Sequence, residues 1–258
     1  MKKKGFIKSF AGICAYDGTR FDGWQSQKNK NGVYDVLKAS IEKTFNTKIE
    51  LEGASRTDSG VHSIGQRRKI QIPMPQYIDC VDRIRKIIND NLPQDICITK
   101  LNKCKESFSP RYNAIRKTYV YRLSFQKPMP SDASFTLYYP YKCNIAKVKK
   151  VLKVFIGRHN FKSFCTKPEK KDTIREIECA YVKIKNKDSI EIYLVGQSFL
   201  RYMVRRLIGA AIESGTKMYN VEYIKKILDK KDPNNALLNL PAKGLTLLKI
   251  EYDNSNFI

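Results

Sequence analysis

The order of the hydrophobic periodicities constrains the fold of this chain more than any other feature of its sequence. In one kind of segment apolar residues alternate with polar ones, as Ile70 and Ile72 do, which is typical of a half-buried β-strand. In the other kind apolar residues recur four positions apart, as Val33, Leu37 and Ile41 do, which places them on one face of a helix. Each half of the chain therefore follows roughly the order β-α-β-β-α-β.

This order predicts an α+β fold with two similar subdomains, each a mainly antiparallel sheet backed by helices. We expect the first subdomain at residues 1–105 and the second at residues 106–258. The two halves resemble each other in the order of their elements and not in their residues. The strands are predicted at 6–16, 49–55, 67–74, 95–101, 117–125, 174–185, 189–196 and 244–253, and the helices at 33–45, 80–91, 144–156, 199–214 and 221–229.

The charge of the chain points to a polyanionic partner. It has 49 Lys and Arg residues against 25 Asp and Glu residues, a net charge of +24, and a pI near 9.7. Such an excess favours nucleic acid, because each phosphate that a basic side chain contacts releases condensed counterions. A lysine-rich proteome is the alternative explanation, and charge alone does not specify RNA.

Several classes of protein and site are disfavoured by what the sequence lacks. No apolar run approaches the ~20 residues of a membrane span, and the basic N-terminus lacks the features of a signal peptide, so we expect a cytoplasmic protein. Nucleotide-binding glycine loops are absent, so no cofactor is expected. With only His62 and His159 to assist them, the cysteines form no zinc-ligand pattern and are expected to be reduced. The cysteines are Cys14, Cys80, Cys97, Cys104, Cys143, Cys165 and Cys179.

One polar segment is a candidate for catalysis. Residues 53–66, GASRTDSGVHSIGQ, lie between two predicted strands, where catalytic groups are often found. Asp58 is two residues from Arg56, with Gly60 just beyond, so its carboxylate could be kept ionised and oriented by a cation. An ordinary Asp/Ser/Gly turn is the alternative, and the spacing alone favours that turn.

Five segments, in this order along the chain, carry a resemblance to a known family. They are YDGTRFDGWQSQ (16–27), the Asp58 segment, FSPRYNAIRKTYVY (108–121), GQSFLRYMVRRLIG (196–209) and LPAKGLTLLKIEY (240–252). Together they resemble the TruA family of tRNA pseudouridine synthases over nearly the whole chain. The resemblance implies an isomerase that converts uridine to pseudouridine in the tRNA anticodon stem-loop, in the region of positions 38–40. It further implies a homodimer and an active site in a basic RNA-binding cleft between the two subdomains.

The resemblance assigns a role to each of four residues. Asp58 matches the nucleophilic aspartate, which has to be ionised, and Arg205 matches its ion-pair partner. Tyr119 matches the tyrosine that stacks on the target base, although a plain core tyrosine is a serious alternative. Arg56 matches the arginine that enters the RNA and helps to hold the flipped base out of its stack.

Further basic residues match regions that contact the RNA backbone, although isolated surface cations are more often simply solvated. They are Arg111, Arg116, Lys167, Lys170, Lys171, Arg201 and Arg206. Ser55 stands where many relatives have glycine, and Arg201 and Arg206 occupy positions that are often uncharged, which leaves the identity of the RNA open. The alternatives are a synthase of the same family that acts on ribosomal or messenger RNA, and an inactive RNA-binding relative.

Overall fold

The computed structural model describes residues 6–74, 80–166, 172–216, 219–235 and 237–258. The chain divides into two compact units, which are Met1–Ile115 with Leu247–Ile258 (unit 1) and Arg116–Thr246 (unit 2). Both units are α+β and mainly antiparallel, which confirms the predicted fold class. None of the described helices is long and apolar enough to cross a membrane.

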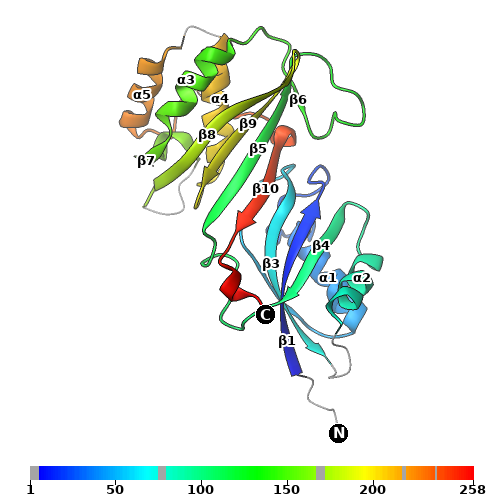
Figure 1. Ribbon diagram of the computed structural model, residues 1–258. Coiled ribbons are helices and arrows are strands. Elements are labelled where there is room, and N and C mark those ends of the chain that lie inside the picture. Colours follow the sequence, from blue (N-terminus) through cyan, green and yellow to red (C-terminus); the bar gives the residue numbers. More distant parts are fainter. Residues whose placement is uncertain (1–5, 75–79, 167–171, 217–218, 236) are drawn as a thin grey trace. The chain divides into compact units, whose positions relative to one another are not determined.

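Unit 1 contains a sheet of strand order β4-β1-β3-β10 (Figure 1). The long strands β1 (Phe6–Tyr16) and β3 (His62–Met74) pair antiparallel, and β4 (Ile96–Lys103) pairs with the other edge of β1. The short strand β2 (Glu50–Gly53) pairs with β3, and β10 (Leu245–Glu251) continues from unit 2 into unit 1.

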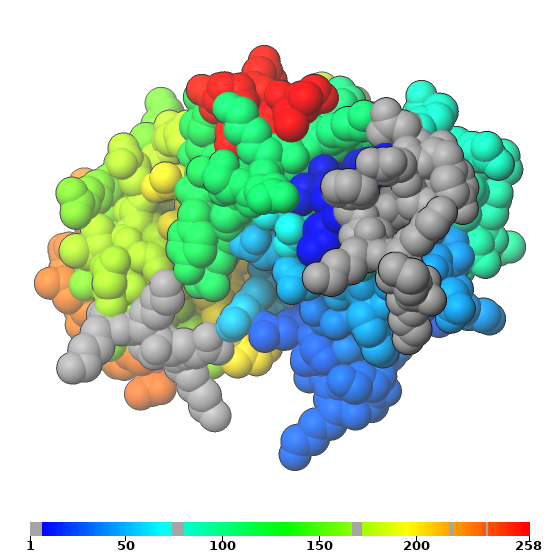
Figure 2. Space-filling view, turned by 90° about the horizontal axis from the view of Figure 1, so that it is seen from below, coloured from blue at the N-terminus to red at the C-terminus, as the bar shows by residue number. Residues whose placement is uncertain are grey.

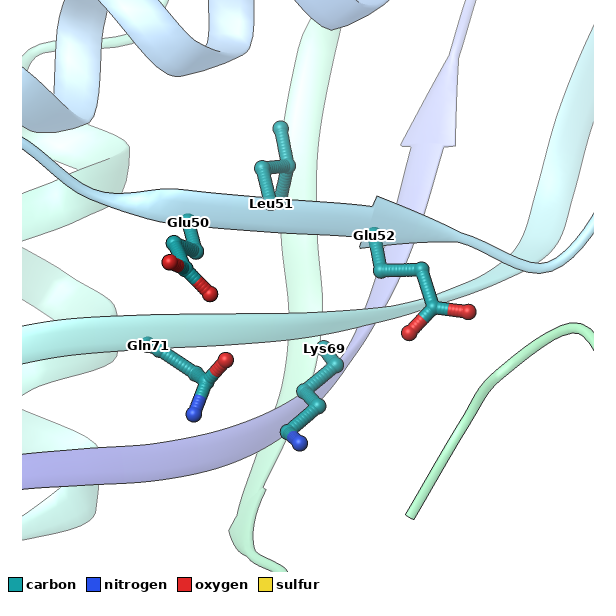
Figure 3. A pocket seen from close by; sticks show the side chains of 5 residues that line it. All are labelled: Glu50, Leu51, Glu52, Lys69 and Gln71. Atoms are coloured by element: carbon teal, nitrogen blue, oxygen red, sulfur yellow. The ribbon is translucent and has the colours of Figure 1, made fainter. Parts of the chain in front are cut away.

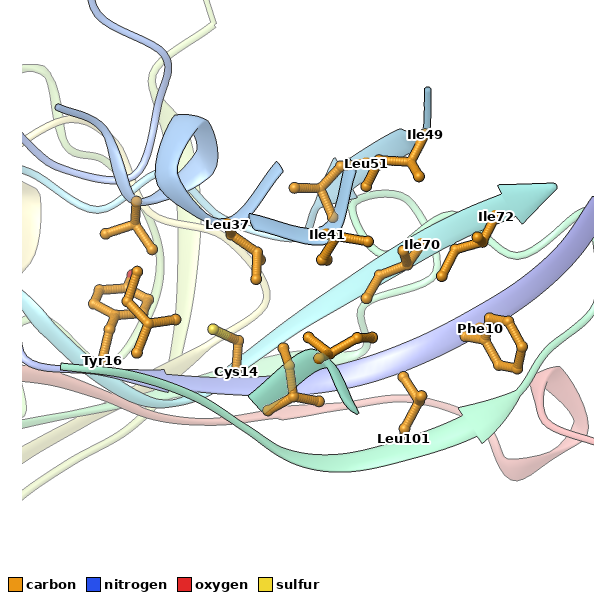
Figure 4. Packing of buried hydrophobic residues seen from close by; sticks show 14 of the residues in the cluster. Phe10, Cys14, Tyr16, Leu37, Ile41, Ile49, Leu51, Ile70, Ile72 and Leu101 are labelled. Atoms are coloured by element: carbon orange, nitrogen blue, oxygen red, sulfur yellow. The ribbon is translucent and has the colours of Figure 1, made fainter. Parts of the chain in front are cut away.

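Two helices, α1 (Val33–Phe45) and α2 (Val81–Asp90), cover one face of the unit 1 sheet. The period of two in each strand sends Phe10 and Ile70, which are register partners, toward these helices. The result is a single apolar core, part of which is drawn in Figure 4. Its fully buried members include Phe10, Cys14, Val33, Leu37, Ile41, Ile70, Ile72, Ile84, Ile88 and Ile98.

The opposite face of this sheet is covered by the end of the chain. Ala11, Cys104 and Phe108 form a small buried cluster, and the rings of Tyr252 and Phe257 pack edge-on against Phe108. Figure 2 shows the red C-terminal residues at the surface beside the green residues that follow β4. Both faces of the unit 1 sheet are therefore packed.

Unit 2 is built on a sheet of order β5-β9-β8-β7. Its strands are β5 (Arg116–Ser124), β9 (Ser189–Gly196), β8 (Ile174–Asn186) and β7 (Gly157–Asn160), and each neighbouring pair is antiparallel. The two-residue strand β6 (Leu137–Tyr138) pairs parallel with β5.

Three helices pack on one face of the unit 2 sheet: α3 (Ile145–Val154), α4 (Met203–Thr216) and α5 (Val221–Lys230) (Figure 1). Helix α4 is the most buried, because residues 207–212 are all inaccessible to solvent. Asn144 and Asn220 cap α3 and α5 by accepting a hydrogen bond from a main-chain N–H in the first turn. Short 3₁₀ turns occur at Lys162–Phe164, Ala242–Gly244 and Asn254–Asn256.

Apart from shifts of a few residues at the ends of other elements, the structure differs from the sequence prediction at the following elements. The short strands β6 and β7, of two and four residues, were not predicted. Helix α4 begins at Met203 and not at residue 199, since Tyr202 has a φ of 61° and a left-handed residue cannot continue a right-handed helix. Strand β3 begins at His62, inside the segment expected to be a loop.

The extent of the units also differs from the expected division. Residues 106–115 and 247–258, expected in the second subdomain, group with unit 1. The N–H of Ile115 donates to the carbonyl of Glu251 (2.9 Å), and the hydroxyl of Tyr252 donates to the carbonyl of Pro110 (2.6 Å). These hydrogen bonds tie the two segments to each other, and Phe108 and Phe257 pack both onto the sheet.

Candidate active site

Asp58 lies in a loop, residues 54–61, between the paired strands β2 and β3; we call it the Asp58 loop. Its base is fixed by two hydrogen bonds, from the N–H of Ala54 to the carbonyl of Arg67 (3.1 Å) and from the Gln66 side chain to the carbonyl of Ser55 (2.6 Å). The N–H of Val61 donates to the carbonyl of Asp58 (3.1 Å), which closes a turn at the far end. Asp58 is half-buried in this framework, and Arg56 is exposed.

Residues 17–24, the first part of the segment between β1 and α1, lie against the Asp58 loop. The N–H of Trp24 donates to the carbonyl of Thr57 (3.1 Å). The carbonyl of Phe21 accepts from the N–H of Gly60 (3.3 Å) and from the Ser59 hydroxyl (3.2 Å). The main chain is therefore held immediately before and immediately after Asp58.

Two glycines allow this close approach. A Cβ atom on Gly18 would stand 2.1 Å from the carbonyl oxygen of Val61, and one on Gly23 would stand 2.6 Å from that of Thr57. Gly23 also has a φ of 90°, which side chains rarely tolerate. The motif YDGTRFDGW thus places glycine at the positions where the two segments touch.

His62, the first residue of β3, ties the far end of the loop to the same segment. It is almost fully buried, and its Nδ1 atom accepts a hydrogen bond from the N–H of Gly18 (3.0 Å) and lies 3.1 Å from Oδ1 of Asp17. Asp17 also accepts from the N–H (2.9 Å) and the hydroxyl (2.6 Å) of Thr19. Partial burial raises the pKa of the Asp17 carboxyl, but the hydrogen bonds from Thr19 lower it, and the net shift is downward.

A buried cation lies at the base of this arrangement. Arg68 is fully buried, and its guanidinium carbon is 3.4 Å from the centroid of the Trp24 ring. Burial lowers the pKa of Arg68, and neighbouring Cys14 and Tyr16 offset part of that shift. A Cβ on Gly53, the register partner of Arg68, would stand 2.6–2.8 Å from three atoms of the same indole. Trp24 therefore covers both members of this cross-strand pair.

Tyr119 and Tyr121 lie on β5 in unit 2, and both are buried. The ring of Tyr119 packs edge-on against Phe199, with centroids 5.2 Å apart. The hydroxyl of Tyr121 donates to the carbonyl of Pro241 (2.8 Å), as expected of a core tyrosine. Burial raises the pKa of Tyr121, and the positive charge of Arg205 offsets part of the shift.

Arg205 lies in the first turn of α4 and is half-buried. Its Nε donates to the carbonyl of Leu240 (2.6 Å), and its guanidinium carbon is 5.1 Å from the ring centroid of Tyr202. The side chain is therefore held in one direction and is not a solvated helix-face arginine. Tyr119 and Arg205 therefore both belong to unit 2, whereas Arg56 and Asp58 share a loop in unit 1.

The other basic candidates differ in how far the fold restrains them. Arg111 is exposed beside the ring of Tyr112, and Arg116 is exposed 3.5 Å from Glu178. Arg201 is exposed in the turn before α4, next to Tyr202. Arg206 is directed inward, because its Nη1 donates to the carbonyls of Pro233 (3.1 Å) and Ser163 (3.4 Å). Lys167, Lys170 and Lys171 lie outside the described residues.

A pocket on unit 1 involves none of these residues. It is lined by Glu50, Leu51, Glu52, Lys69 and Gln71 of β2 and β3 (Figure 3). Glu52 accepts a hydrogen bond from Ser109, and the Lys69 ammonium donates to the carbonyl of Glu106. Two carboxylates beside a lysine already engaged within the protein do not suit a phosphate, so we assign the pocket no part in RNA binding. Among the described residues, no group of three or more His, Cys, Asp or Glu side chains could hold a metal ion.

A family model described as tRNA pseudouridine synthase matches residues 13–113 and 151–253. The chain belongs to this family. The matched segments include Arg56, Asp58 and Arg205, whereas Tyr119 and Arg116 fall in the unmatched stretch between them.

Curated relatives agree with this assignment. The chain is 33% identical over 246 residues to tRNA pseudouridine synthase A of Thermosipho melanesiensis, covering 95% of this chain and 100% of the relative. It is 34% identical over 241 residues to tRNA pseudouridine synthase A of Caldicellulosiruptor bescii, covering 92% of this chain and 96% of the relative. The resemblance to the TruA family is thereby confirmed.

Sequence reasoning missed the residues that support the Asp58 loop. Tyr16, Trp24 and His62 belong to segments that were read only as family signatures, and Arg68 was read only as part of a strand. A signal was present for Arg68, because it shares the strand period of Ile70 and Ile72 and so has to face the core.

Proposed function

We propose that the protein is a tRNA pseudouridine synthase that isomerises uridine in the anticodon stem-loop, with Asp58 as the nucleophile. The observation that carries the proposal is the position of Asp58. It lies within the matched family segment, on a loop whose main chain is hydrogen-bonded on both sides of the aspartate. A nucleophile benefits from such restraint, because small displacements of a reacting group are costly in rate.

The reaction breaks the C1′–N1 glycosidic bond, turns the base and joins C1′ to C5, and the proton on C5 is replaced by one on N1. The product is an isomer of the substrate, so no oxidant, reductant or second substrate is consumed. In the proposal the Asp58 carboxylate adds covalently either to the uracil ring or to C1′ and leaves when the C1′–C5 bond is complete.

Three further residues have roles in the proposal. Arg205 pairs with Asp58 and keeps its carboxylate ionised, which suits a guanidinium already oriented by Leu240 and Tyr202. Tyr119 stacks on the target uracil. Arg56, exposed on the Asp58 loop, occupies the space that the flipped base leaves in the RNA.

The setting of the enzyme completes the proposal. Arg111, Arg116, Arg201 and the lysines of 167–171 contact the RNA backbone, whereas the inward-directed Arg206 does not, and the +24 charge supports a polyanionic substrate. The described cysteines are free thiols, which supports a reducing cytoplasm. The enzyme acts as a homodimer, which light scattering of the purified protein would test.

The test uses total RNA from a strain that lacks this enzyme. The RNA is incubated with the wild type, with Asp58→Asn, or with Asp82→Asn, which alters an exposed carboxylate on α2. Pseudouridines are then mapped by carbodiimide treatment and primer extension. We expect new marks in tRNA anticodon stem-loops with the wild type and Asp82→Asn, and none with Asp58→Asn.

Each other outcome selects a different conclusion. Marks in ribosomal or messenger RNA would identify a synthase with another target. Tight RNA binding without marks would leave an inactive binding protein. Marks that persist with Asp58→Asn would exclude Asp58 as the nucleophile.

A further inference from the structure

We propose that Tyr16 is a positioning residue for the isomerisation, acting through Thr57 on Asp58. The hydroxyl of Tyr16 lies 2.8 Å from the hydroxyl of Thr57, the residue immediately before Asp58. This inference rests on the proposed role of Asp58 as the nucleophile, and its experiment separates a failure of one from a failure of the other.

The hydrogen bond between the two hydroxyls is buried. Tyr16 is 4% exposed and Thr57 is 8% exposed, so water does not replace either partner at low cost. Tyr16 is the last residue of β1, whose pairing with both β3 and β4 makes it a rigid support. The hydroxyl that holds Thr57 is thus fixed by the central strand of unit 1.

Thr57 is held twice, because its side chain meets Tyr16 and its carbonyl accepts from the N–H of Trp24 (3.1 Å). Together these bonds fix the orientation of the peptide unit that leads into Asp58. Ser59 and Gly60 are held on the other side by the carbonyl of Phe21. The hydrogen bond between the Tyr16 and Thr57 hydroxyls can be removed by deleting one oxygen atom, while the packing of the Tyr16 ring and the main chain are kept.

A covalent step tolerates only a small error in the position of the attacking group, so the support of Asp58 affects catalysis. The carboxylate has to approach one carbon of a flipped nucleotide, and an error well below the length of a bond slows the attack. Recognition of the RNA involves many contacts elsewhere and does not depend on this geometry. Loss of the Tyr16 hydroxyl should therefore slow turnover and leave tRNA affinity unchanged.

The test compares Tyr16→Phe and Thr57→Val with the wild type. We expect kcat to fall about tenfold in each, and the Kd for tRNA from filter binding to stay within about twofold. The double variant should be no slower than either single variant, because both remove the same hydrogen bond. The matched control is the Tyr139–Thr216 hydroxyl pair of unit 2 (3.2 Å), where Tyr139→Phe should leave kcat unchanged.

If Asp58→Asn is inactive as expected, any one of three results would overturn the inference about Tyr16. One is a wild-type kcat in Tyr16→Phe. Another is a double variant in which the fold decrease in kcat equals the product of the decreases in the two single variants. The third is a lower melting temperature in Tyr16→Phe than in Tyr139→Phe together with weaker tRNA binding, which indicates a purely structural role. An active Asp58→Asn would instead defeat the proposed function itself.

Discussion

The guanidinium carbon of Arg68 lies 3.4 Å from the centroid of the Trp24 ring, so a fully buried cation is stacked on an aromatic face. Such stacking compensates for only part of the free energy of taking a charge out of water. Trp24 also belongs to the segment that holds the Asp58 loop, since its N–H donates to the carbonyl of Thr57. The stability of unit 1 and the geometry of the candidate site therefore depend on the same indole.

The first prediction contrasts the two partners of this stack. Arg68→Met removes the buried charge and keeps the volume, so we expect the free energy of unfolding to be unchanged or to rise by about 1–4 kcal/mol. Trp24→Leu leaves the cation without its aromatic face and opens space in the core, so we expect a loss of about 3–5 kcal/mol. Urea denaturation of each variant measures both changes. A loss in Arg68→Met as large as in Trp24→Leu would contradict this account.

The second prediction concerns the contact between segment 17–24 and the Asp58 loop. Gly18→Ala places a Cβ atom 2.1 Å from a main-chain oxygen, so the two segments have to separate and activity should fall at least about 100-fold. Gly12→Ala is the control, because its Cβ would meet only the movable side chain of Leu101 closely, at 3.3 Å. Steady-state kinetics on tRNA measures the difference. Equal activities of the two variants would show that the close approach is unimportant.

The third prediction is a pH dependence of stability that arises from Asp17. Its pKa is lowered in the folded protein, so the ionised carboxylate stabilises the fold above its unfolded pKa, about 3.9. This contribution is lost as the pH falls through the lower, folded value. We expect Asp17→Asn to be less stable than the wild type at pH 6 and the difference to vanish near pH 2. Asp82→Asn, at an exposed site, should show no comparable convergence.

The fourth prediction is the salt dependence of tRNA binding. If about six phosphates are contacted, the log–log slope of affinity against salt should be near −4, at ~0.7 per phosphate. Arg111→Ala should reduce the magnitude of this slope by about 0.7 if Arg111 contacts one phosphate. Lys153→Ala, on the exposed side of α3, serves as the control. A slope near zero would exclude the RNA backbone as the main source of affinity.

The fold was largely predictable because its elements are periodic. Helix α1 has the predicted bounds, and β5 differs from its prediction by one residue at each end. The start of α4 was not predictable, since the left-handed backbone of Tyr202 leaves no trace in the spacing of apolar residues.

The site was predictable only in part. Asp58 stands out within a polar segment, but its support comes from residues 16–24, which are far away in sequence and meet it only when β1 and β3 pair. A hydroxyl pair such as Tyr16 and Thr57 has no signature until the fold brings it together. Arg68 follows the strand period of Ile70, but nothing in the sequence indicates that Trp24 would cover it.

The grouping of residues 247–258 with unit 1 bears on how the protein is made. Unit 2 is a continuous stretch of chain inserted into unit 1, whose second sheet face is covered by Tyr252 and Phe257. During translation unit 2 has all its residues before unit 1 does. The unit that carries Asp58 is therefore completed last. A chain truncated immediately before residue 247 would contain all of unit 2 but would lack the residues that cover the second face of the unit 1 sheet.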